Sequence, residues 1–300
     1  MKKKRKISAF DVINIFILLV IALICIYPLY YTVIASFSDF IPVATGKVSF
    51  WPVDFTTLAY EAVFKNSDIW LGYRNTIIYT VCGTLFNLFL TVPTAYVMSK
   101  KYMFGHNFFT WFFLITMYFS GGMVPTYLLY QNLHLINNPM VMIVSGGLSV
   151  YNMIVVRTYF ASSIPDSLYE ATRIDGGSEF TQFFRIALPL SKPVVAVIAL
   201  YYAVGHWNGY FNAMMYLSNK KYHPLALVLR RILIQNESVV SDDMLANMDA
   251  RILQDLTQKA NMAVVMKYAL VLISSLPLLI AYPFIQKYFV KGVMIGSVKG

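Results

Sequence analysis

Long apolar blocks separated by short polar segments dominate this chain. The blocks lie at about 12–35, 75–98, 108–130, 138–158, 194–214 and 264–286. Each one reaches the roughly 20 residues that a helix needs to cross a hydrocarbon layer of about 30 Å. No alternation of apolar and polar positions indicates a barrel, and in lipid the backbone must satisfy its own hydrogen bonds. The pattern therefore predicts an all-α, polytopic membrane protein with six transmembrane helices.

Composition and charge agree with this arrangement. Of the 300 residues, 58% are hydrophobic and only 13% are charged, which is unlike a soluble domain. Basic residues fall on one side of the six predicted spans: residues 2–6, Lys100, Lys101, Arg157, Arg173, Arg185, Lys192, Lys287, Lys291 and Lys299. Since cytoplasmic loops carry the excess of Lys and Arg, both termini are expected in the cytoplasm. The net charge of +10 is then a topology signal and does not indicate nucleic-acid binding.

The chain reads as a basic cytoplasmic N-terminus, residues 1–11, followed by a single transmembrane domain, residues 12–300. The first apolar block is longer than the core of a signal peptide and no A-x-A site follows it, so we expect an uncleaved first span. Two external segments are predicted, at 36–74 with a short helix over Leu58–Lys65 and at 215–263 with a helix over Met244–Lys259. Cys25 and Cys82 lie inside predicted spans and are expected to be packing residues.

The apolar blocks lack the residues that would power transport. No Asp, Glu, Lys or Arg lies deep in any of them, which disfavours a proton- or sodium-driven carrier with ionisable groups or interrupted helices at the midplane. Gly46-Lys47 lacks the flanking residues of a phosphate-binding loop, and no catalytic cluster occurs at one depth. We therefore expect a transport subunit that is not an enzyme, holds no cofactor and takes its energy from a partner.

The fifth block carries the candidate solute contacts. Asn208 and Asn212 lie one helical turn apart, beside Trp207 and Phe211, and amides with aromatic rings suit an uncharged, hydroxyl-rich solute. Helix packing with an interfacial aromatic belt is the alternative, since Gly205-x-x-x-Gly209 would permit close helix approach. His206 has no second histidine or carboxylate spaced to join it, so no metal site is predicted.

A polar loop at about 161–193 separates the fourth and fifth blocks. Ser163 and Asp166 form a variant capping box, and Ile164, Leu168 and Ala171 share one face of the helix that would follow. Gly176-Gly177 can end that helix in a left-handed turn, and Ser178 can begin a second one. A helix, a turn and a helix at the membrane surface suit the groove of a partner, although a plain solvated loop is the alternative.

The loop carries a recognisable order of residues: Glu170-Ala171, Asp175-Gly176, Ile186, Leu188 and Pro189. This resembles the cytoplasmic E-A-x-x-x-D-G…I-x-L-P loop of ABC importer permeases. His223-Pro224-Leu225 and the C-terminal segment Tyr282–Gly300 resemble the maltose-type carbohydrate permeases, and among them the lipoprotein/polysaccharide-transport permease subfamily of Gram-positive bacteria.

This resemblance implies the type I ABC importer transmembrane-domain fold and a permease subunit that imports an oligosaccharide or polysaccharide fragment by alternating access. Its partners would be a second homologous permease, two copies of a cytoplasmic ATPase that bind ATP and Mg, and an extracellular solute-binding lipoprotein. The location would be the plasma membrane of a bacterium, in contact with lipid. The ATPase-coupling residues would be Glu170, Ala171, Arg173, Asp175, Gly176, Gly177 and Pro189. A non-sugar solute and a secondary carrier remain alternatives, and the sequence leaves open which sugar and which ATPase are used.

Overall fold

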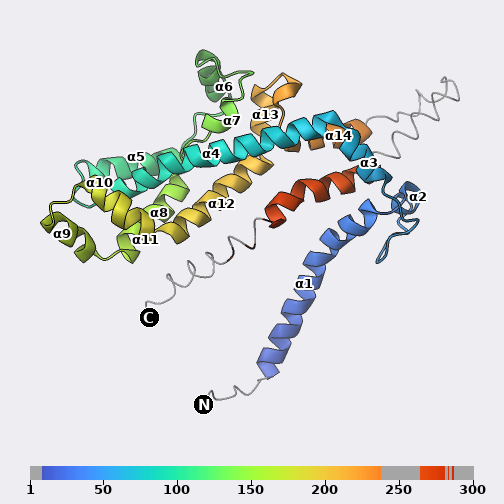
Figure 1. Cartoon of the computed structure of the whole chain (residues 1–300), viewed down its shortest axis with the longest axis horizontal. Helices are drawn as coiled ribbons and strands as arrows, with labels where there is room; N and C mark the ends of the chain where they lie inside the picture. The colour runs from blue at the N-terminus through green and yellow to red at the C-terminus, as the bar shows by residue number, and fades with distance from the viewer. Residues whose placement is uncertain (1–8, 238–263, 281–282, 284–285, 287–300) are drawn as a thin grey trace. The chain divides into compact units, whose positions relative to one another are not determined.

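The computed structural model describes residues 9–237 and 264–280, together with 283 and 286. All regular elements in these residues are helical (Figure 1). The long helices and their short companions are α1 Ala9–Ser36, α2 Phe40–Ala44, α3 Leu58–Lys65, α4 Ser67–Ser99, α5 His106–Tyr118, α6 Met123–Asn132, α7 Val141–Val144, α8 Val150–Ser163, α9 Asp166–Ile174, α10 Glu179–Thr181, α11 Leu188–Leu190, α12 Lys192–Asn208, α13 Phe211–Tyr216 and α14 Leu225–Glu237. A π-helical segment covers Gln182–Ala187, a 3₁₀ turn covers Lys220–Tyr222, and a further apolar helix covers Val264–Ile280. The all-α prediction is confirmed for this part of the chain.

The chain divides into two compact units, and the first comprises residues 1–67 and 229–276. Its helix α1 has 28 residues, and most of its apolar side chains are exposed within the chain, as expected of a helix that faces lipid or a partner. In the following segment Phe37 stacks on Phe55 and Tyr60, and α3 covers the predicted range Leu58–Lys65. The helix predicted over Met244–Lys259 and most of the C-terminal segment Tyr282–Gly300 lie outside the described residues.

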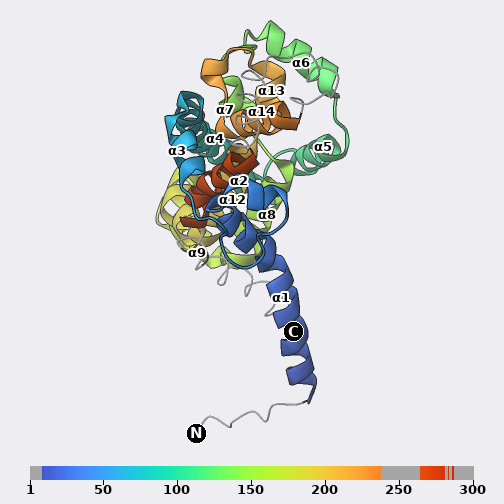
Figure 2. The ribbon, with the colours of Figure 1, turned by 90° about the vertical axis from the view of Figure 1, so that its right-hand side faces the viewer.

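The second unit comprises residues 68–228 and 277–300, and its core lies between α4, α8 and α12. Buried side chains from all three helices meet there: Val92, Ala95, Tyr96, Met98, Met153, Val156, Phe160, Val194, Ile198 and Tyr202. A second cluster joins α4, α7 and α13 through Tyr79, Val141, Met142, Ala213 and Tyr216. Figure 2 shows α7 and α13 close together beside α6. This unit carries both candidate sites described below.

Three of the six expected spans are not continuous helices. The block at 108–130 forms α5 and α6, which meet at 112°, and the block at 138–158 forms α7 and α8 with a break between them. The block at 194–214 ends as a helix at Asn208 and resumes as α13 at Phe211. Among the described residues, two helices are long and apolar enough to cross a membrane alone, or four if each bent pair forms one span. The expected count of six remains a prediction.

The break between α7 and α8 has a clear physical basis. Gly146 has φ +68°, a left-handed conformation that side chains disfavour, and it turns the backbone out of the helix. The carbonyls of Gly146 and Gly147 accept hydrogen bonds from Asn87 Nδ2 at 3.1 and 2.8 Å. The hydroxyl of Tyr202 accepts from the amide of Ser149 at 3.1 Å. Side chains of α4 and α12 therefore satisfy a backbone that could not otherwise leave the helix inside a membrane.

Candidate functional site

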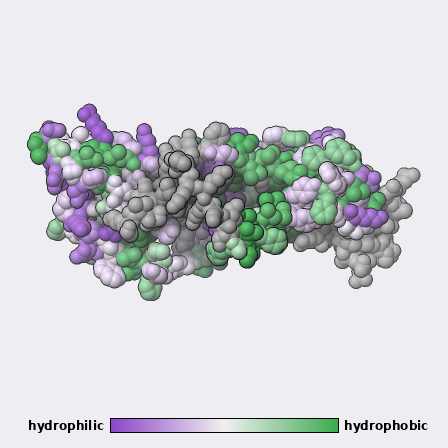
Figure 3. Space-filling model, turned by 90° about the horizontal axis from the view of Figure 1, so that it is seen from below, coloured by the Kyte–Doolittle hydropathy of each residue, from purple (hydrophilic) through white to green (hydrophobic). Residues whose placement is uncertain are grey.

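The polar loop folds as a short helix, a glycine turn and a second helical segment. Hydrophilic side chains gather around α9 and α10, on the left of Figure 1 and of Figure 3. After α9, Gly176 has φ +75°, and the amide of Gly177 donates to the carbonyl of Thr172 at 2.8 Å. The Ser178 side chain then caps α10 by accepting from the amide of Thr181. The left-handed turn and the role of Ser178 are confirmed.

The start of α9 differs from the prediction. Ser163 is the last residue of α8, and Pro165, which has no side-chain acceptor, occupies the N-cap position of α9. The Ser163–Asp166 capping box does not form, because α8 continues through Ser163, the residue that was expected to cap the loop helix. Ile164 is buried, whereas Leu168 and Ala171, which were expected on the same helix face, are exposed. Tyr169, one position away from Leu168, is the buried residue of α9.

The exposed face of α9 is the surface available to a partner. Ile174 is 86% exposed and Leu168 40%, and both are apolar residues on a short, otherwise polar helix. Glu170, Ala171 and Asp175 are also exposed. A groove of about 260 Å³ lies beside this helix, lined in part by Lys100, Lys101, Asp166, Glu170 and Arg173. Apolar side chains between charged ones are the composition expected of a docking surface.

Tyr169 fixes α9 to the end of α4 through an aromatic and cationic cluster. The ammonium of Lys100 lies 3.0 Å from the ring centroid of Tyr169 and 4.8 Å from that of Tyr96. Burial lowers the pKa of the Lys100 ammonium to about 8, against the raising effect of the Glu179 carboxylate. Burial also raises the pKa of Tyr169 to about 12, so its phenol stays neutral. The cluster is an anchor for the helix rather than a site for chemistry.

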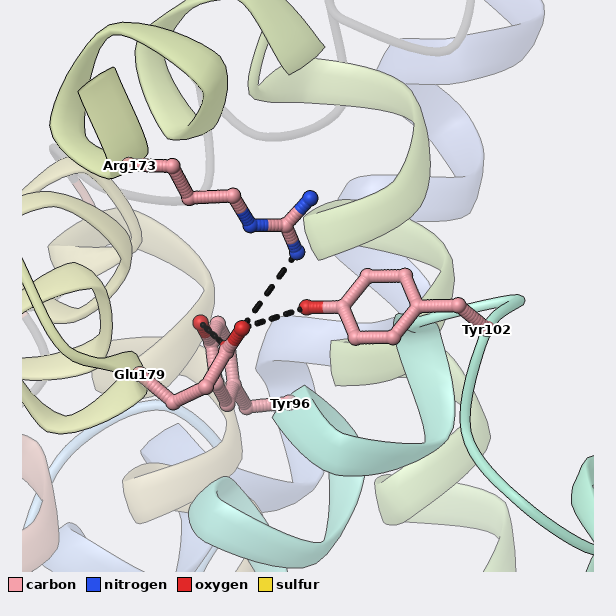
Figure 4. Close-up of polar contacts among 4 residues, drawn as sticks. All are labelled: Tyr96, Tyr102, Arg173 and Glu179. Carbon is pink, nitrogen blue, oxygen red and sulfur yellow. Dashed lines mark hydrogen bonds and ion pairs between the residues drawn. The ribbon is translucent and has the colours of Figure 1, made fainter.

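Glu179, which the sequence analysis did not identify, holds three side chains together. Its carboxylate accepts hydrogen bonds from Tyr102 at 2.8 Å, Tyr96 at 3.2 Å and Arg173 at 3.3 Å (Figure 4). The Arg173 guanidinium also lies 4.6 Å from the centroid of the Tyr102 ring. Burial raises the pKa of the Glu179 carboxyl, but the hydrogen bonds from Tyr102, Arg173 and Tyr96 outweigh it, and the pKa lies below its usual value. No motif in the sequence marks position 179.

The remaining loop residues form an irregular bridge into α12. The π-helical segment Gln182–Ala187 precedes α11, which holds the exposed Pro189, and the direction changes by 78° between Glu179–Leu190 and Lys192–Asn208. π-Helical turns occur preferentially at functional sites and need no sequence motif of their own. The structure therefore places Pro189 in the bend between the loop and α12, two residues before Ser191, which is fully buried.

A second candidate site is a polar pocket of about 180 Å³ between α4, α7, α12 and α13. The polar side chains that line it are Asn87, Ser145, Tyr201, Tyr202, His206 and Asn212. Two helix breaks flank it, one at Ser145–Ser149 and one at Gly209–Tyr210. Discontinuous helices in membrane transporters expose polar backbone where a cavity needs it, so such breaks commonly mark a solute path.

Asn87 and His206 form the centre of this pocket. The Asn87 amide donates to the two glycine carbonyls, which leaves its Oδ1 as the acceptor for His206 Nε2 at 2.7 Å. His206 is therefore protonated on Nε2 in this arrangement. A Cβ on Gly83 would overlap the His206 ring, so that glycine makes room for it. None of the described residues that line the pocket carries a fixed charge.

The predicted solute-contact residues separate into two groups. Asn212 lines the pocket and donates to Ser145 Oγ at 3.3 Å. Trp207 is buried and packs edge-on against Tyr73 with ring centroids 5.8 Å apart, while Asn208 and Phe211 are exposed outside the pocket. The helix break at Gly209 changes the register that would have aligned the two asparagines. Asn87 also lines the pocket, but the sequence did not indicate this, because its polarity is the only feature that distinguishes it within its apolar block.

Other expectations about the apolar blocks need correction. Among the described residues, no neighbouring atom lies within 4 Å of a Cβ built on Gly205, and Gly209 contacts only its own helix, so this glycine pair mediates no close approach between described helices. Cys25 and Cys82 are exposed free thiols and do not pack inside the chain. In the described ranges no group of three or more His, Cys, Asp or Glu side chains is placed to hold a metal.

Comparison with known proteins identifies the class. The chain belongs to the family described as binding-protein-dependent transport system inner membrane component, which matches residues 69–295. It is thus a membrane-embedded transport subunit and not an enzyme. The family implies an ATPase and a solute-binding protein as partners, and the ATPase would supply the energy source that the sequence lacks.

Particular relatives narrow the class. The chain is 38% identical to Protein LplC of Bacillus subtilis (strain 168) over 97% of this chain and 95% of the relative. It is 34% identical to the polygalacturonan/rhamnogalacturonan transport system permease protein YtcP of the same organism, covering 97% and 98%. One chain in the crystal structure of a bacterial ABC transporter involved in the import of the acidic polysaccharide alginate matches with a TM-score of 0.81 and 32% identity, covering 96% and 99%. This chain therefore has the fold of an ABC importer permease.

Proposed function

We propose that this chain is the permease subunit of an ATP-driven ABC importer for a carbohydrate, either an oligosaccharide or a polysaccharide fragment. The observation that carries the proposal is the near full-length similarity to proteins named for polysaccharide transport, joined to an exposed helix, α9. An ATPase and a solute-binding protein are the partners that the family implies. The six spans, the cytoplasmic termini, the bacterial plasma membrane, a second homologous permease and two ATPase copies complete the proposed arrangement.

The proposed coupling surface is the exposed face of α9 with the glycine turn. Glu170, Ala171 and Asp175 are accessible there, next to Ile174, whose side chain is almost fully exposed. Gly176 and Gly177 shape the turn, Arg173 is tied to Glu179, and Pro189 lies in the bend toward α12. Movement of the docked ATPases would displace α9 and, through this loop, the spans. The ATP and Mg would stay with the ATPases.

The proposed solute path runs along the pocket between α4, α7, α12 and α13. Its lining offers amide, hydroxyl and imidazole groups without fixed charge, which match the hydroxyls of a sugar ring. Asn212 belongs to this path, whereas Trp207, Asn208 and Phe211, which the sequence also suggested, lie outside the pocket. Acidic groups of a uronic acid polymer would find no cation here, so we assign the pocket to an uncharged part of the cargo.

Affinity purification of this chain from its native membrane, followed by mass spectrometry, tests the proposal. We expect a second permease, an ATPase with a phosphate-binding loop and a binding lipoprotein to copurify, and the sugar bound to the lipoprotein identifies the cargo. Reconstitution of the recovered complex should give uptake that depends on ATP. A folded, stable chain recovered alone, or solute transport by the chain without nucleotide, would contradict the importer and favour a secondary carrier.

A further inference from the structure

Glu179 brings together three parts of the second unit that are separate in sequence. Tyr96 belongs to the last turn of α4, Tyr102 to the turn between α4 and α5, and Arg173 to the last turn of α9 (Figure 4). All three donate to the same carboxylate, within 2.8 to 3.3 Å. Glu179 itself opens α10, directly after the glycine turn. The carboxylate is therefore the junction between the exposed helix and α4.

The junction keeps its charge under physiological conditions. The pKa of the Glu179 carboxyl lies below its usual value because hydrogen bonds from Tyr102, Arg173 and Tyr96 outweigh the effect of burial. An ionised acceptor makes shorter and stronger hydrogen bonds than a neutral one. Glu179 can therefore hold both tyrosines and the arginine throughout a transport cycle near neutral pH.

Helix α4 connects this junction to the polar pocket. It runs without interruption from Ser67 to Ser99, and Asn87 lies nine positions before Tyr96 on the same helix. At 1.5 Å per residue the two are about 14 Å apart along the helix axis. Pro93 lies between them and removes one backbone hydrogen bond of the helix, but Val92 and Ala95 on either side of it are buried against α8 and α12, so packing holds this stretch together. A displacement at Tyr96 would therefore reach the Asn87–His206 pair.

We propose that Glu179 is a positioning residue that ties α9 to α4, so that displacement of α9 by a docked ATPase moves the helix that lines the solute pocket. This inference rests on the proposed function, and it adds a path by which movement of the ATPases reaches the solute pocket. Both routes from α9 are physical contacts: one runs along the chain through the bend at Ser191, and the other crosses directly to α4 through Glu179. The second route acts on the Asn87 side of the pocket and the first on the His206 side.

The contact suits a coupling role better than a stabilising one. The side chains of Arg173 and Glu179 are about half exposed, at 46% and 51%, and exposed ion pairs contribute little to stability. Substitution of Glu179 is therefore expected to leave folding and membrane insertion intact. Its effect should appear in the ratio of sugar imported to ATP hydrolysed, which a purely structural contact would not change.

The test compares E179A with E61A in the complete importer reconstituted in liposomes with its binding protein. Glu61 is a matched control, because its side chain is 55% exposed, pairs with Lys65 at 3.8 Å and lies in the other unit, which contains neither α9 nor the pocket. ATP hydrolysis and sugar uptake are measured together. E179A should hydrolyse ATP but import about five-fold less sugar per ATP, the lower end of typical coupling effects. E61A should match the wild type in this ratio.

A second variant, Y102F, covers the case in which E179A fails to fold. It removes only the hydroxyl of the 2.8 Å hydrogen bond and keeps the ring that faces Arg173. Y102F should lower the sugar imported per ATP in the same direction, and the Y102F/E179A double variant should be no worse than E179A, because both changes act on one contact. Strictly additive losses would contradict a shared route.

The outcomes separate this inference from the proposed function. If the wild-type complex shows no ATP-dependent uptake, the importer itself is wrong. If the wild type imports sugar and E179A and Y102F retain the ratio measured for E61A, the importer stands and the role of Glu179 is overturned. A lower ratio in E179A and Y102F, with ATPase copurification unchanged, supports the route through α4.

Discussion

At the scale of single residues, the two adjacent glycines of the polar loop are required for different reasons. Gly176 has φ +75° but open space around it, so its requirement is one of backbone conformation. Gly177 has no such φ, yet a Cβ there would lie 2.5 Å from Thr172 Cγ2 and 2.9 Å from the Thr172 carbonyl oxygen. Gly176, the last residue of the E-A-x-x-x-D-G pattern, is therefore needed for the turn, whereas Gly177, the next residue, is needed for close packing on Thr172.

Replacing Gly176 with valine should uncouple the transporter. A β-branched residue at this φ costs about 1–2 kcal/mol or more, so the turn shifts and α9 loses its position. We expect normal membrane levels but at least about ten-fold less ATP-driven uptake, measured in the reconstituted importer. Gly46 offers a matched control, because it has φ +69° and open space in the other unit. Equal losses in G46V and G176V would show that backbone strain alone, and not the loop, lowers uptake.

The charge of Lys100 should make stability depend on pH. Its pKa is about 8 in the fold and about 10.5 in the unfolded chain, so the unfolded chain holds the proton more tightly. Stability therefore rises as pH increases from about 8 toward 10.5, as the cost of burying the charge disappears. Glu179, Arg173 and Asp166 are the charged groups that act on it.

Thermal unfolding of purified protein in detergent measures this effect. The melting temperature of the wild type relative to K100M should increase between about pH 7 and pH 9.5. The comparison cancels the tyrosines, which are common to both proteins. A constant difference across this range would mean that Lys100 does not change protonation there.

Replacing each of the two asparagines of the fifth apolar block should have different effects on sugar uptake. Asn212 lines the polar pocket, while Asn208 is exposed at the end of α12 and outside it. N212L should raise the KM for sugar uptake about ten-fold, roughly the value of one hydrogen bond to a neutral solute. N208L is the matched control and should leave KM unchanged. An unchanged KM in N212L would place the sugar contacts on the partner permease.

At the scale of elements, hydropathy predicted which segments are apolar but not where their helices break. The blocks at 12–35 and 75–98 became α1 and α4, although each contains an internal proline, Pro28 in α1 and Pro93 in α4. The break after Val144 depends on Asn87, which lies more than fifty residues earlier and satisfies the freed carbonyls. A hydropathy window averages over Gly146 and is too short to include Asn87.

In the polar loop, too, only part of the structure could be predicted from the sequence. Its turn and the Ser178 cap follow from local chemistry and were predictable. The burial of Tyr169 instead of Leu168 depends on Lys100 and Tyr96, which come from α4 and the turn after it. Glu179 gains its importance only from where Tyr102 and Arg173 lie. Contacts between elements, rather than propensities within them, decide these positions.

Replacing Asn87 with leucine should destabilise the broken span. The carbonyls of Gly146 and Gly147 and the imidazole of His206 would lose their partner, at a cost of about 2 kcal/mol or more. The buried hydroxyl of Thr84, on the same helix, accepts and donates no hydrogen bond in the described structure, so T84V is a matched control that should be neutral. Denaturant unfolding in detergent measures both. Equal stability of N87L and T84V would mean that water replaces the amide.

At the scale of the whole molecule, the proposed function assigns ATPase docking to one part of the chain and solute passage to another, and leaves nucleotide hydrolysis to a partner. The exposed helix α9 and the polar pocket both belong to the second unit, and α4 contributes to the pocket and to the anchor of α9. A subunit of this design is expected to be inert alone. Its activity should be a property of the assembly.

Removing the docking surface should therefore separate transport from folding. I174E places a charge on a side chain that is 86% exposed, so the chain should fold and insert normally. The same change should prevent the ATPase from copurifying, because burying an unpaired charge in an interface is costly. R185E is the control, because Arg185 is exposed and lies in the same loop, on the π-helical segment. This variant should retain the ATPase. If I174E retained the ATPase and ATP-driven uptake, the partner would dock elsewhere on the chain.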